Sequence, residues 1–259
     1  MTDAGPEGSK AAKAPKPVRQ SKRAHLFAII GLIILAASGP LGIAGMLSPM
    51  VAMLANTIAA VLLIIAFIIA LRALLGNRKN NVLESTLTTW IVLVVSFGVV
   101  MGMINQMRPS GPTAAIHDIS TNVENPPAFV DIVALREADG APNPPEYNYD
   151  ESAALTLETY PDLQTIIIEE EQRAVFARAT EAAEQMGWEV VAAVQPEGRI
   201  EAVAVTPFVG FRDDVVIRVI SIGDNATAVD IRSKSRIGKG DMGANAKRIR
   251  AWQDKLLSQ

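Results

Sequence analysis

Residues 26–71 read LFAIIGLIILAASGPLGIAGMLSPMVAMLANTIAAVLLIIAFIIAL, and this stretch governs how the chain is organised. Its 46 residues include no Asp, Glu, Lys or Arg. Because a helix needs about 20 apolar residues to cross the hydrocarbon core of a bilayer, the stretch predicts two membrane-spanning helices. Ser48-Pro49 is the natural turn between them, so we expect these helices near residues 26–47 and 50–72.

A second uncharged stretch, residues 85–107, predicts a third spanning helix near 86–106, with Trp90 close to one membrane interface. Residues 25–107 are therefore expected to form a transmembrane region of three helices. Residues 1–24 carry six Lys or Arg and little apolar surface, which cannot offset the entropy lost on ordering. We expect them to form a disordered basic tail.

The distribution of Lys and Arg around the helices predicts the orientation of the chain. The tail carries six, the loop after the second helix carries three, and the turn between the first two helices carries none. The positive-inside rule then places the tail and the second loop in the cytoplasm. With three spans, everything after Arg108 lies outside. We expect a bacterial inner membrane protein whose C-terminal domain is periplasmic. Its helices are expected to interact with the lipid bilayer.

Composition excludes several kinds of chemistry. The 259-residue chain has a net charge of −3, but from residue 108 onward 24 acidic residues outnumber 15 basic ones. An acidic outer domain argues against nucleic-acid binding. The absence of cysteine rules out disulfides, thiolate metal sites and a Cys nucleophile. With two histidines, and with Glu169–Glu171 expected in a first helical turn, we predict no metal and no cofactor.

Residues 113–259 are long enough to bury a core of their own. After a Pro-rich strap at 113–162, the core at 163–257 is predicted to contain a strand, a helix, four antiparallel strands and a final helix. The expected elements lie at 163–168, 169–187, 188–195, 199–206, 214–222, 227–235 and 243–257. The predicted fold is three N-terminal transmembrane helices followed by an α+β domain, with a curved antiparallel sheet and helices packed on one face.

The strap at 113–162 holds most of the domain's prolines and all three tyrosines, Tyr147, Tyr149 and Tyr160. Proline cannot donate to a β-ladder, so long strands are not expected here. The segment either packs its aromatic side chains onto the domain or forms a binding loop, and we favour the packed strap. The sequence leaves open whether it covers the polar face of the sheet.

The last predicted strand, 227–235, and the residue after it carry alternating charges. Side chains alternate across a strand, so four charged groups share one face: Asp230, Arg232, Lys234 and Arg236. They either form internal ion pairs or bind an anion such as phosphate, carboxylate or sulfate through the planar guanidinium groups. The candidate ligand-binding residues here are Arg218, Arg232, Ser233, Ser235 and Arg236, with Glu201, Asp213, Asp214 and Asp230 as supporting acids.

Residues 238–243, Gly-Lys-Gly-Asp-Met-Gly, lie between that strand and the last helix and match the pattern G-x-G-x-x-G. A dinucleotide site needs a βαβ unit, and only a helix is expected after this loop, so we exclude such a site. The loop is either a turn beside a helix cap, which we favour, or a cradle for an anion. The candidate ligand-binding residues here are Lys239, Asp241, Asn245 and Arg248.

A series of short motifs runs through the outer domain. They are Tyr160-Pro161-Asp162, Gly187-Trp188, Glu201-Ala202, Phe211 to Asp214 with Arg218, Val229 to Arg236, Gly238 to Asp241, Gly243, Asn245-Ala246 and Arg248-Ile249. Together they resemble the domain of unknown function 1499 family over most of residues 113–256. The resemblance implies a place in the bacterial envelope and brings no established activity. Many members look singly anchored or lipid-modified, whereas this chain has three predicted spans and no cysteine.

We expect a non-enzymatic envelope protein whose outer domain binds an anionic ligand or a protein partner through the Arg-rich strand and the Gly-rich loop. One alternative is an enzyme that acts on an envelope glycan or phospholipid through carboxylates such as Glu201 or Asp213. Another is a structural subunit of a membrane complex that associates through its helices. A Ser-His catalytic pair is not favoured, because His117 is the only histidine of the outer domain.

Overall fold

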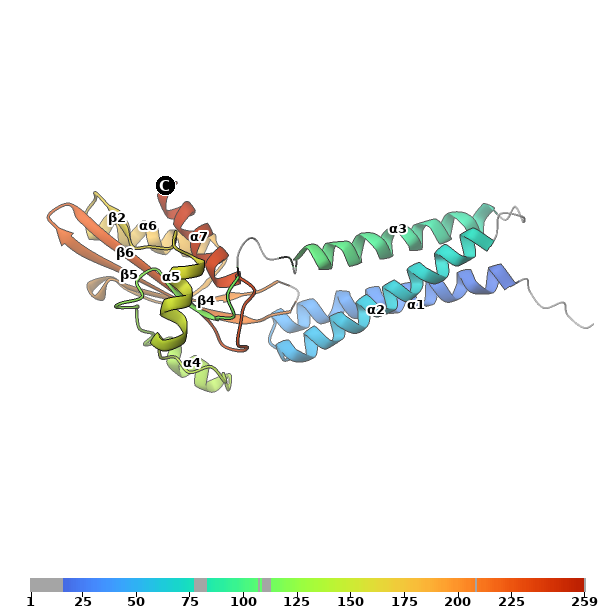
Figure 1. Ribbon diagram of the computed structural model, residues 1–259, viewed down its shortest axis with the longest axis horizontal. Coiled ribbons are helices and arrows are strands. Elements are labelled where there is room, and N and C mark those ends of the chain that lie inside the picture. Colours follow the sequence, from blue (N-terminus) through green and yellow to red (C-terminus); the bar gives the residue numbers. More distant parts are fainter. Residues whose placement is uncertain (1–15, 77–82, 107, 109–112, 208, 259) are drawn as a thin grey trace, which may run out of the picture. The chain divides into compact units, whose positions relative to one another are not determined.

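The computed structural model describes residues 16–76, 83–106, 108, 113–207 and 209–258, which form two compact units. Three long helices make up most of the first unit: α1 (Lys16–Ile43), α2 (Pro49–Gly76) and α3 (Leu83–Gln106) (Figure 1). Each contains a stretch that is long and apolar enough to cross a membrane: Lys22–Ile43, Pro49–Leu75 and Leu87–Asn105. The expectation of three spanning helices is confirmed.

Helix α1 begins earlier than expected. Its first turns include Lys16–Ala24, which the sequence predicts to be disordered, and the remaining tail residues, 1–15, lie outside the described residues. Helix α2 starts at Pro49, the second residue of the expected turn. Proline suits this position, because its fixed φ matches a helix and its missing N–H would have no partner in the first turn.

Small side chains allow α1 and α2 to approach closely. A Cβ on Gly31 would lie 3.1 Å from the Ala59 carbonyl oxygen and 3.2 Å from Leu63 Cγ. The Ser38 hydroxyl donates a buried hydrogen bond to the Asn56 side-chain oxygen. Close contacts at small residues and hydrogen bonds between polar side chains are the usual means by which membrane helices associate.

The second unit contains an open six-stranded antiparallel sheet in the order β1-β6-β5-β4-β3, with β2 also paired to β6. The strands are β1 (Asp118–Ser120), β2 (Ile166–Ile168), β3 (Glu189–Val194), β4 (Arg199–Val205), β5 (Arg212–Gly223) and β6 (Ala226–Ser235). The two expected hairpins are present, β3–β4 and β5–β6. Strand β2 is shorter than predicted, and β1 is a three-residue strand of the strap, where long strands are not expected.

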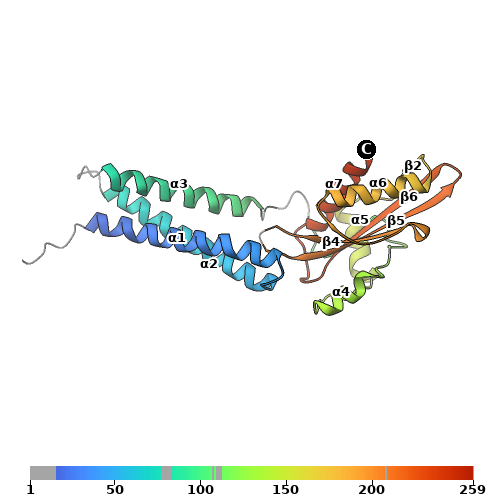
Figure 2. The ribbon, with the colours of Figure 1, turned by 180° about the vertical axis from the view of Figure 1, so that it is seen from behind.

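Two helices, α6 (Gln172–Gln185) and α7 (Ala244–Leu257), pack on one face of the sheet. Seen from behind in Figure 2, α6 lies in front of the sheet, while α5 (Ala154–Thr159) lies behind it. The α7 residues Ile249, Trp252 and Leu256 are fully buried, as their helical spacing predicts.

The acidic run Glu169–Glu171 is placed differently from the prediction. It precedes α6 instead of forming its first turn, and the N-cap residue Glu171 makes no side-chain capping bond. The reason is that β2 runs to Ile168 in register with β6, so the chain needs these residues to turn from strand to helix.

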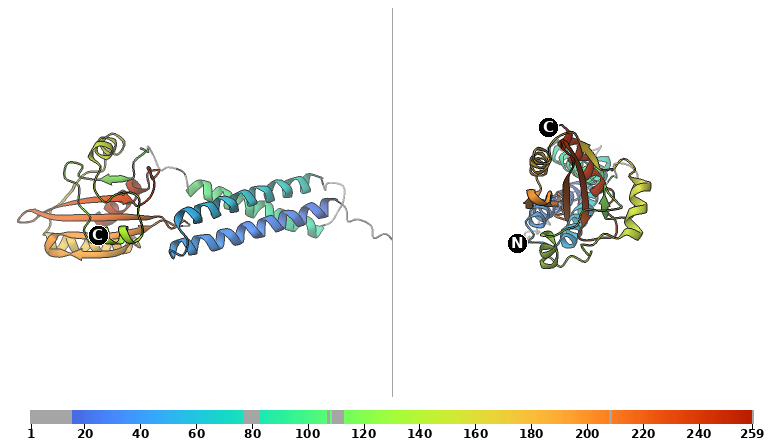
Figure 3. Two further views of the ribbon diagram at one scale, coloured as in Figure 1. Left: turned by 90° about the horizontal axis from the view of Figure 1, so that it is seen from below. Right: turned by 90° about the vertical axis from the view of Figure 1, so that its left-hand side faces the viewer.

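The strap, residues 113–162, covers the other face of the sheet. It is more regular than predicted, since it contains β1, α4 (Ile132–Ala138), a single π-helical turn (Tyr149–Ala153) and α5. Figure 3 shows the sheet between α6 on one side and α5 on the other. The polar sheet face is therefore a covered interface, and its charged side chains meet the strap.

Candidate functional site

Strand β6 divides the predicted binding residues between the two faces of the sheet. Four charged side chains point to the strap and are each at most 3% exposed: Asp230, Arg232, Lys234 and Arg236. Ser233 and Ser235 point to the opposite face, where both bond to a side chain of α7. The structure therefore does not bring these serines together with the cations of the strand.

Asp118 of β1 neutralises two cations of β6. Its carboxylate accepts hydrogen bonds from Arg232 Nε and Nη2, both at 2.8 Å, and from Lys234 Nζ at 2.9 Å. The Arg232 guanidinium also lies 4.7 Å from the ring centroid of Phe129 and 5.2 Å from that of Tyr147, within the range of cation–π attraction. Further donors of both cations go to backbone carbonyls of the strap.

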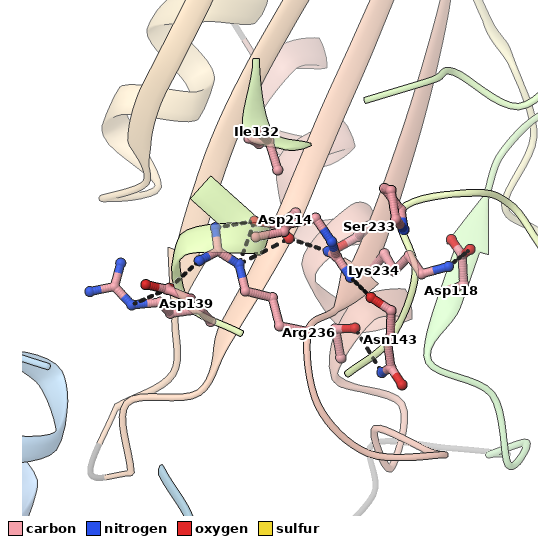
Figure 4. A network of polar contacts seen from close by, with 12 residues as sticks. Asp118, Ile132, Asp139, Asn143, Asp214, Ser233, Lys234 and Arg236 are labelled. Carbon is pink, nitrogen blue, oxygen red and sulfur yellow. Dashed lines mark hydrogen bonds and ion pairs between the residues drawn. The ribbon is translucent and has the colours of Figure 1, made fainter. Parts of the chain in front are cut away.

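Asp214 of β5 has the same role for two arginines. Its Oδ1 accepts from Arg236 Nη2 at 2.7 Å and Nε at 3.0 Å, and its Oδ2 accepts from Arg136 Nη1 of α4. Asp139, which follows α4 and is half exposed, pairs with Arg236 from the other side. Figure 4 shows the Arg236 guanidinium between Asp139 and Asp214, with Lys234 and Asp118 in the same network.

Glu201 and Arg218 also connect the sheet to the strap. The fully buried Glu201 carboxylate accepts from three successive backbone N–H groups where α4 begins, those of residues 130, 131 and 132, at 2.9, 3.3 and 2.9 Å. Arg218 donates to Asp230 Oδ2 at 2.6 Å and to the Asn125 carbonyl of the strap at 2.7 Å. The supporting acids on this face thus serve ion pairs and backbone groups within the domain.

Burial under the strap shifts the pKa values of several side chains. Desolvation lowers the pKa of Lys234, because removal from water disfavours its charged form, and Asp118 offsets part of this effect. Burial alone would lower the pKa of Arg236, but its interactions with Asp214 and Asp139 together outweigh burial and raise the pKa. Desolvation and the nearby Asp118 carboxylate raise the pKa of Tyr147 to about 12. The Tyr147 phenol therefore stays neutral at neutral pH.

A second polar group lies on the helix face of β6. Asn245 of α7 accepts from Ser233 Oγ at 2.6 Å, and Arg248 donates to the same hydroxyl at 3.0 Å and to Asp213 Oδ2 at 2.6 Å. Of the two adjacent acids that open β5, Asp213 therefore serves the helix face and Asp214 serves the strap face. Strand alternation separates them, although they are neighbours in sequence.

The Gly-rich loop at 238–243 supplies its own anion. The two oxygens of the Asp241 carboxylate accept from the backbone N–H groups of Gly243, at 2.8 Å, and Asn245, at 2.6 Å. Such N–H groups at a helix N-terminus are those that an anion cradle would offer to a phosphate. The arrangement matches the helix-cap interpretation, while Lys239 is exposed beside it. Burial raises the pKa of the Asp241 carboxyl.

The ion pairs and hydrogen bonds of these residues connect the sheet to the strap and to α7, and so stabilise the fold of the domain. Each cation of β6 donates to a carboxylate of the same chain. Glu201 and Asp213, the acids considered for catalysis, are buried and bonded to groups of the domain itself. In the part of the chain that the structure describes, no group of three His, Asp or Glu is arranged to hold a metal ion.

Sequence reasoning missed the strap's half of this network, namely Asp118, Arg136 and Tyr147. The signal available was the charge pattern of β6, because three cations on one strand face need acidic partners. The identity of those partners was hidden, since the strap has no periodicity and Asp118 lies 116 residues before Lys234.

The sequence matches known families along most of its length. Residues 118–256, more than half of the chain, match the family model described as Protein of unknown function (DUF1499). The chain belongs to this family. The DUF1499 match begins at Asp118, so the family domain includes the strap together with the sheet that it covers. Residues 8–115 are similar to a second family, described as Family of unknown function (DUF6750). No curated protein sequence matches the chain.

Proposed function

We propose that this membrane protein holds its DUF1499 domain on the periplasmic side of a bacterial inner membrane, where the domain acts as a non-catalytic binding module for a protein partner. One observation carries the proposal. The charged face of β6 is already occupied by the strap, with each of its cations paired to Asp118 or Asp214. A ligand that used Arg232 or Arg236 would have to displace the strap and break these pairs. We therefore assign binding of the protein partner to side chains that the strap leaves exposed to solvent.

The proposed location rests on the sequence. Lys and Arg gather in the tail and in the loop after α2, and the positive-inside rule then directs residues after Arg108 to the outer side. The resemblance of the domain to envelope proteins points to the same compartment.

An anionic ligand is the second candidate, and the Gly-rich loop favours it. Gly238, Lys239 and Gly240 are exposed, so this turn offers a cation and accessible backbone next to β6. The amides of the following helix start are held by Asp241, which limits the contacts available to such a ligand. An enzymatic role has weaker support, because Glu201 is fully buried and accepts backbone hydrogen bonds.

The test is to cross-link the full chain in its own membranes, purify it and identify what is attached, beside a variant that lacks residues 113–259. A protein attached to the full chain and lost with the deletion supports the binding module. A protein retained by the deletion variant would instead establish association through the helices. Native mass spectrometry of the uncross-linked chain tests the second candidate, which predicts a small added mass that Lys239→Ala removes.

A further inference from the structure

The strap does not reach the far end of the β5–β6 hairpin. Its last bond to that face is the one from Arg218 Nη2 to the Asn125 carbonyl. The next residue of β5 on the same face is Ile220, since side chains alternate along a strand. Ile220 is 42% exposed, and no described residue of the strap bonds to the sheet beyond Arg218 on this strand.

Three strands place apolar side chains side by side at this open end. Ile167 of β2 is opposite Ala228 of β6, and Ala228 is opposite Ile220 of β5, so the three residues form one cross-strand row on the strap face. Ile222 follows in the adjacent β-bulge. Ile167 and Ile222 are 55% and 54% exposed. We call Ile167, Ala228, Ile220 and Ile222 the apolar row.

Acidic residues surround the apolar row. Asp224 lies in the turn between β5 and β6, and Glu169 follows β2 directly, with its carbonyl bonded to the Asn225 side chain of that turn. Glu124 adjoins Asn125, which binds Arg218. All three acids are exposed. The cations nearby are engaged or face away. Arg218 pairs with Asp230, and Arg199, opposite Arg218 on β4, pairs with acidic side chains of its own, Asp131, Glu197 and Glu201. Arg178 lies on α6, on the other face, and pairs with Glu170.

We propose that the apolar row docks a segment of a protein partner that presents apolar side chains flanked by Lys or Arg. This inference rests on the proposed function and names the surface and the chemistry of the partner. An exposed cluster of large apolar side chains rimmed by charge is typical of an interaction site. The acidic rim selects a basic flank by charge complementarity and speeds its approach.

The same charges argue against two other occupants. An anionic bilayer surface attracts basic segments and would be repelled by the rim. A second copy of this chain in a two-fold contact would place each acidic rim against the other, because such a contact uses the same patch on both subunits.

The experiment introduces the photo-cross-linker p-benzoylphenylalanine into the full chain at Ile222, in the cells that make it. Leu157, an exposed apolar residue of α5 with 57% exposure, is the matched control position. Mass spectrometry then identifies the residues of the partner attached to each position. The expected result is a peptide with apolar residues flanked by Lys or Arg, attached at Ile222 and not at Leu157.

Charge reversal tests the rim. Asp224→Lys combined with Glu169→Lys is expected to lower the yield of this cross-link about tenfold, the effect of roughly 1.4 kcal/mol of lost affinity. Asp150→Lys combined with Glu158→Lys makes the same charge change on the exposed part of the strap and should leave the yield unchanged. Thermal unfolding midpoints equal to that of the wild-type chain would show that both double variants retain the fold.

Several outcomes would overturn the inference. They are a lipid adduct at Ile222, a cross-link to a second copy, a partner segment without basic residues, and no adduct at Ile222 while Leu157 captures a protein. That last result would leave the proposed function intact. If no position in the outer domain captures a protein, the proposed function itself fails.

Discussion

Asp118 neutralises two buried cations with one carboxylate. Both oxygens bind Arg232, and one of them also binds Lys234, so the group makes three charge-assisted hydrogen bonds in a site removed from water. Removing one partner of a buried ion pair leaves an uncompensated charge in the interior. The resulting loss of folding stability is larger than the stability that the intact pair contributes. The energetic effect of this residue should therefore greatly exceed that of a surface acid.

Asp118→Asn is expected to destabilise the domain by about 3–5 kcal/mol, because two cations lose their shared counter-charge. At about 2–4 °C per kcal/mol, the unfolding midpoint should fall by roughly 10 °C. The control is Asp162→Asn, which breaks the exposed pair with Arg250 and should cost under about 1 kcal/mol. Differential scanning fluorimetry of the full chain in nanodiscs measures both. Equal midpoints for the two variants would contradict the buried role of Asp118.

Tyr147 provides a pH-dependent signal from beneath the strap. Its pKa is raised to about 12 when folded, mainly by desolvation, against an ordinary value near 10. Between these two values the unfolded chain loses the phenolic proton while the folded chain keeps it, so stability falls as pH rises through this window. The difference in ultraviolet titration between wild type and Tyr147→Phe should show a phenol that ionises near pH 12. A difference curve centred near pH 10 would mean that Tyr147 is solvated.

Among the elements of the sheet, the β3–β4 hairpin is held in place by a close approach between the backbone of its turn and the backbone of β5. Gly198 closes the turn with φ +62°, and a Cβ there would lie 2.0 Å from the Val219 carbonyl oxygen of β5. The Gly198 carbonyl in turn accepts from the Val219 N–H at 2.7 Å. The turn can therefore dock against β5 only if residue 198 has no side chain, and one glycine supports both the hairpin and its place in the sheet.

Gly198→Ala is expected to cost more than the roughly 1 kcal/mol of a left-handed backbone conformation, because the added methyl also collides with β5. Gly140→Ala separates the two causes, since Gly140 has the same φ of +62° with nothing within 4 Å of the added carbon. Chemical unfolding of both variants gives the comparison. If Gly140→Ala were as destabilising as Gly198→Ala, the steric contact would not be the dominant cause.

For the whole molecule, three apolar helices connect an acidic domain to a basic tail. The positive-inside rule predicts that the tail and the loop after α2 are cytoplasmic, because they carry most of the Lys and Arg near the helices. Three candidate spans among the described residues then predict that the domain lies on the opposite side.

The chain has no cysteine, so single introduced cysteines report topology directly. Leu157→Cys is expected to react with a membrane-impermeant maleimide in intact spheroplasts, because it is exposed in the outer domain. Ser9→Cys in the tail should react only after the membrane is permeabilised. Labelling in the reverse order would invert the assigned orientation.

Local sequence patterns were sufficient to predict the spanning helices, the two hairpins and the helices α6 and α7, because each depends on a nearby arrangement of apolar residues or turn residues. The strand alternation of Asp230, Arg232, Lys234 and Arg236 was also local, so their shared face was predicted correctly. The residues that pack against that face could be identified only from the folded chain. Asp118 and Arg136 come from a strap without periodicity, and their positions follow from pairing with residues that are far away in sequence. Such contacts depend on how the whole chain packs, because a buried charge must find its partner wherever the fold brings one.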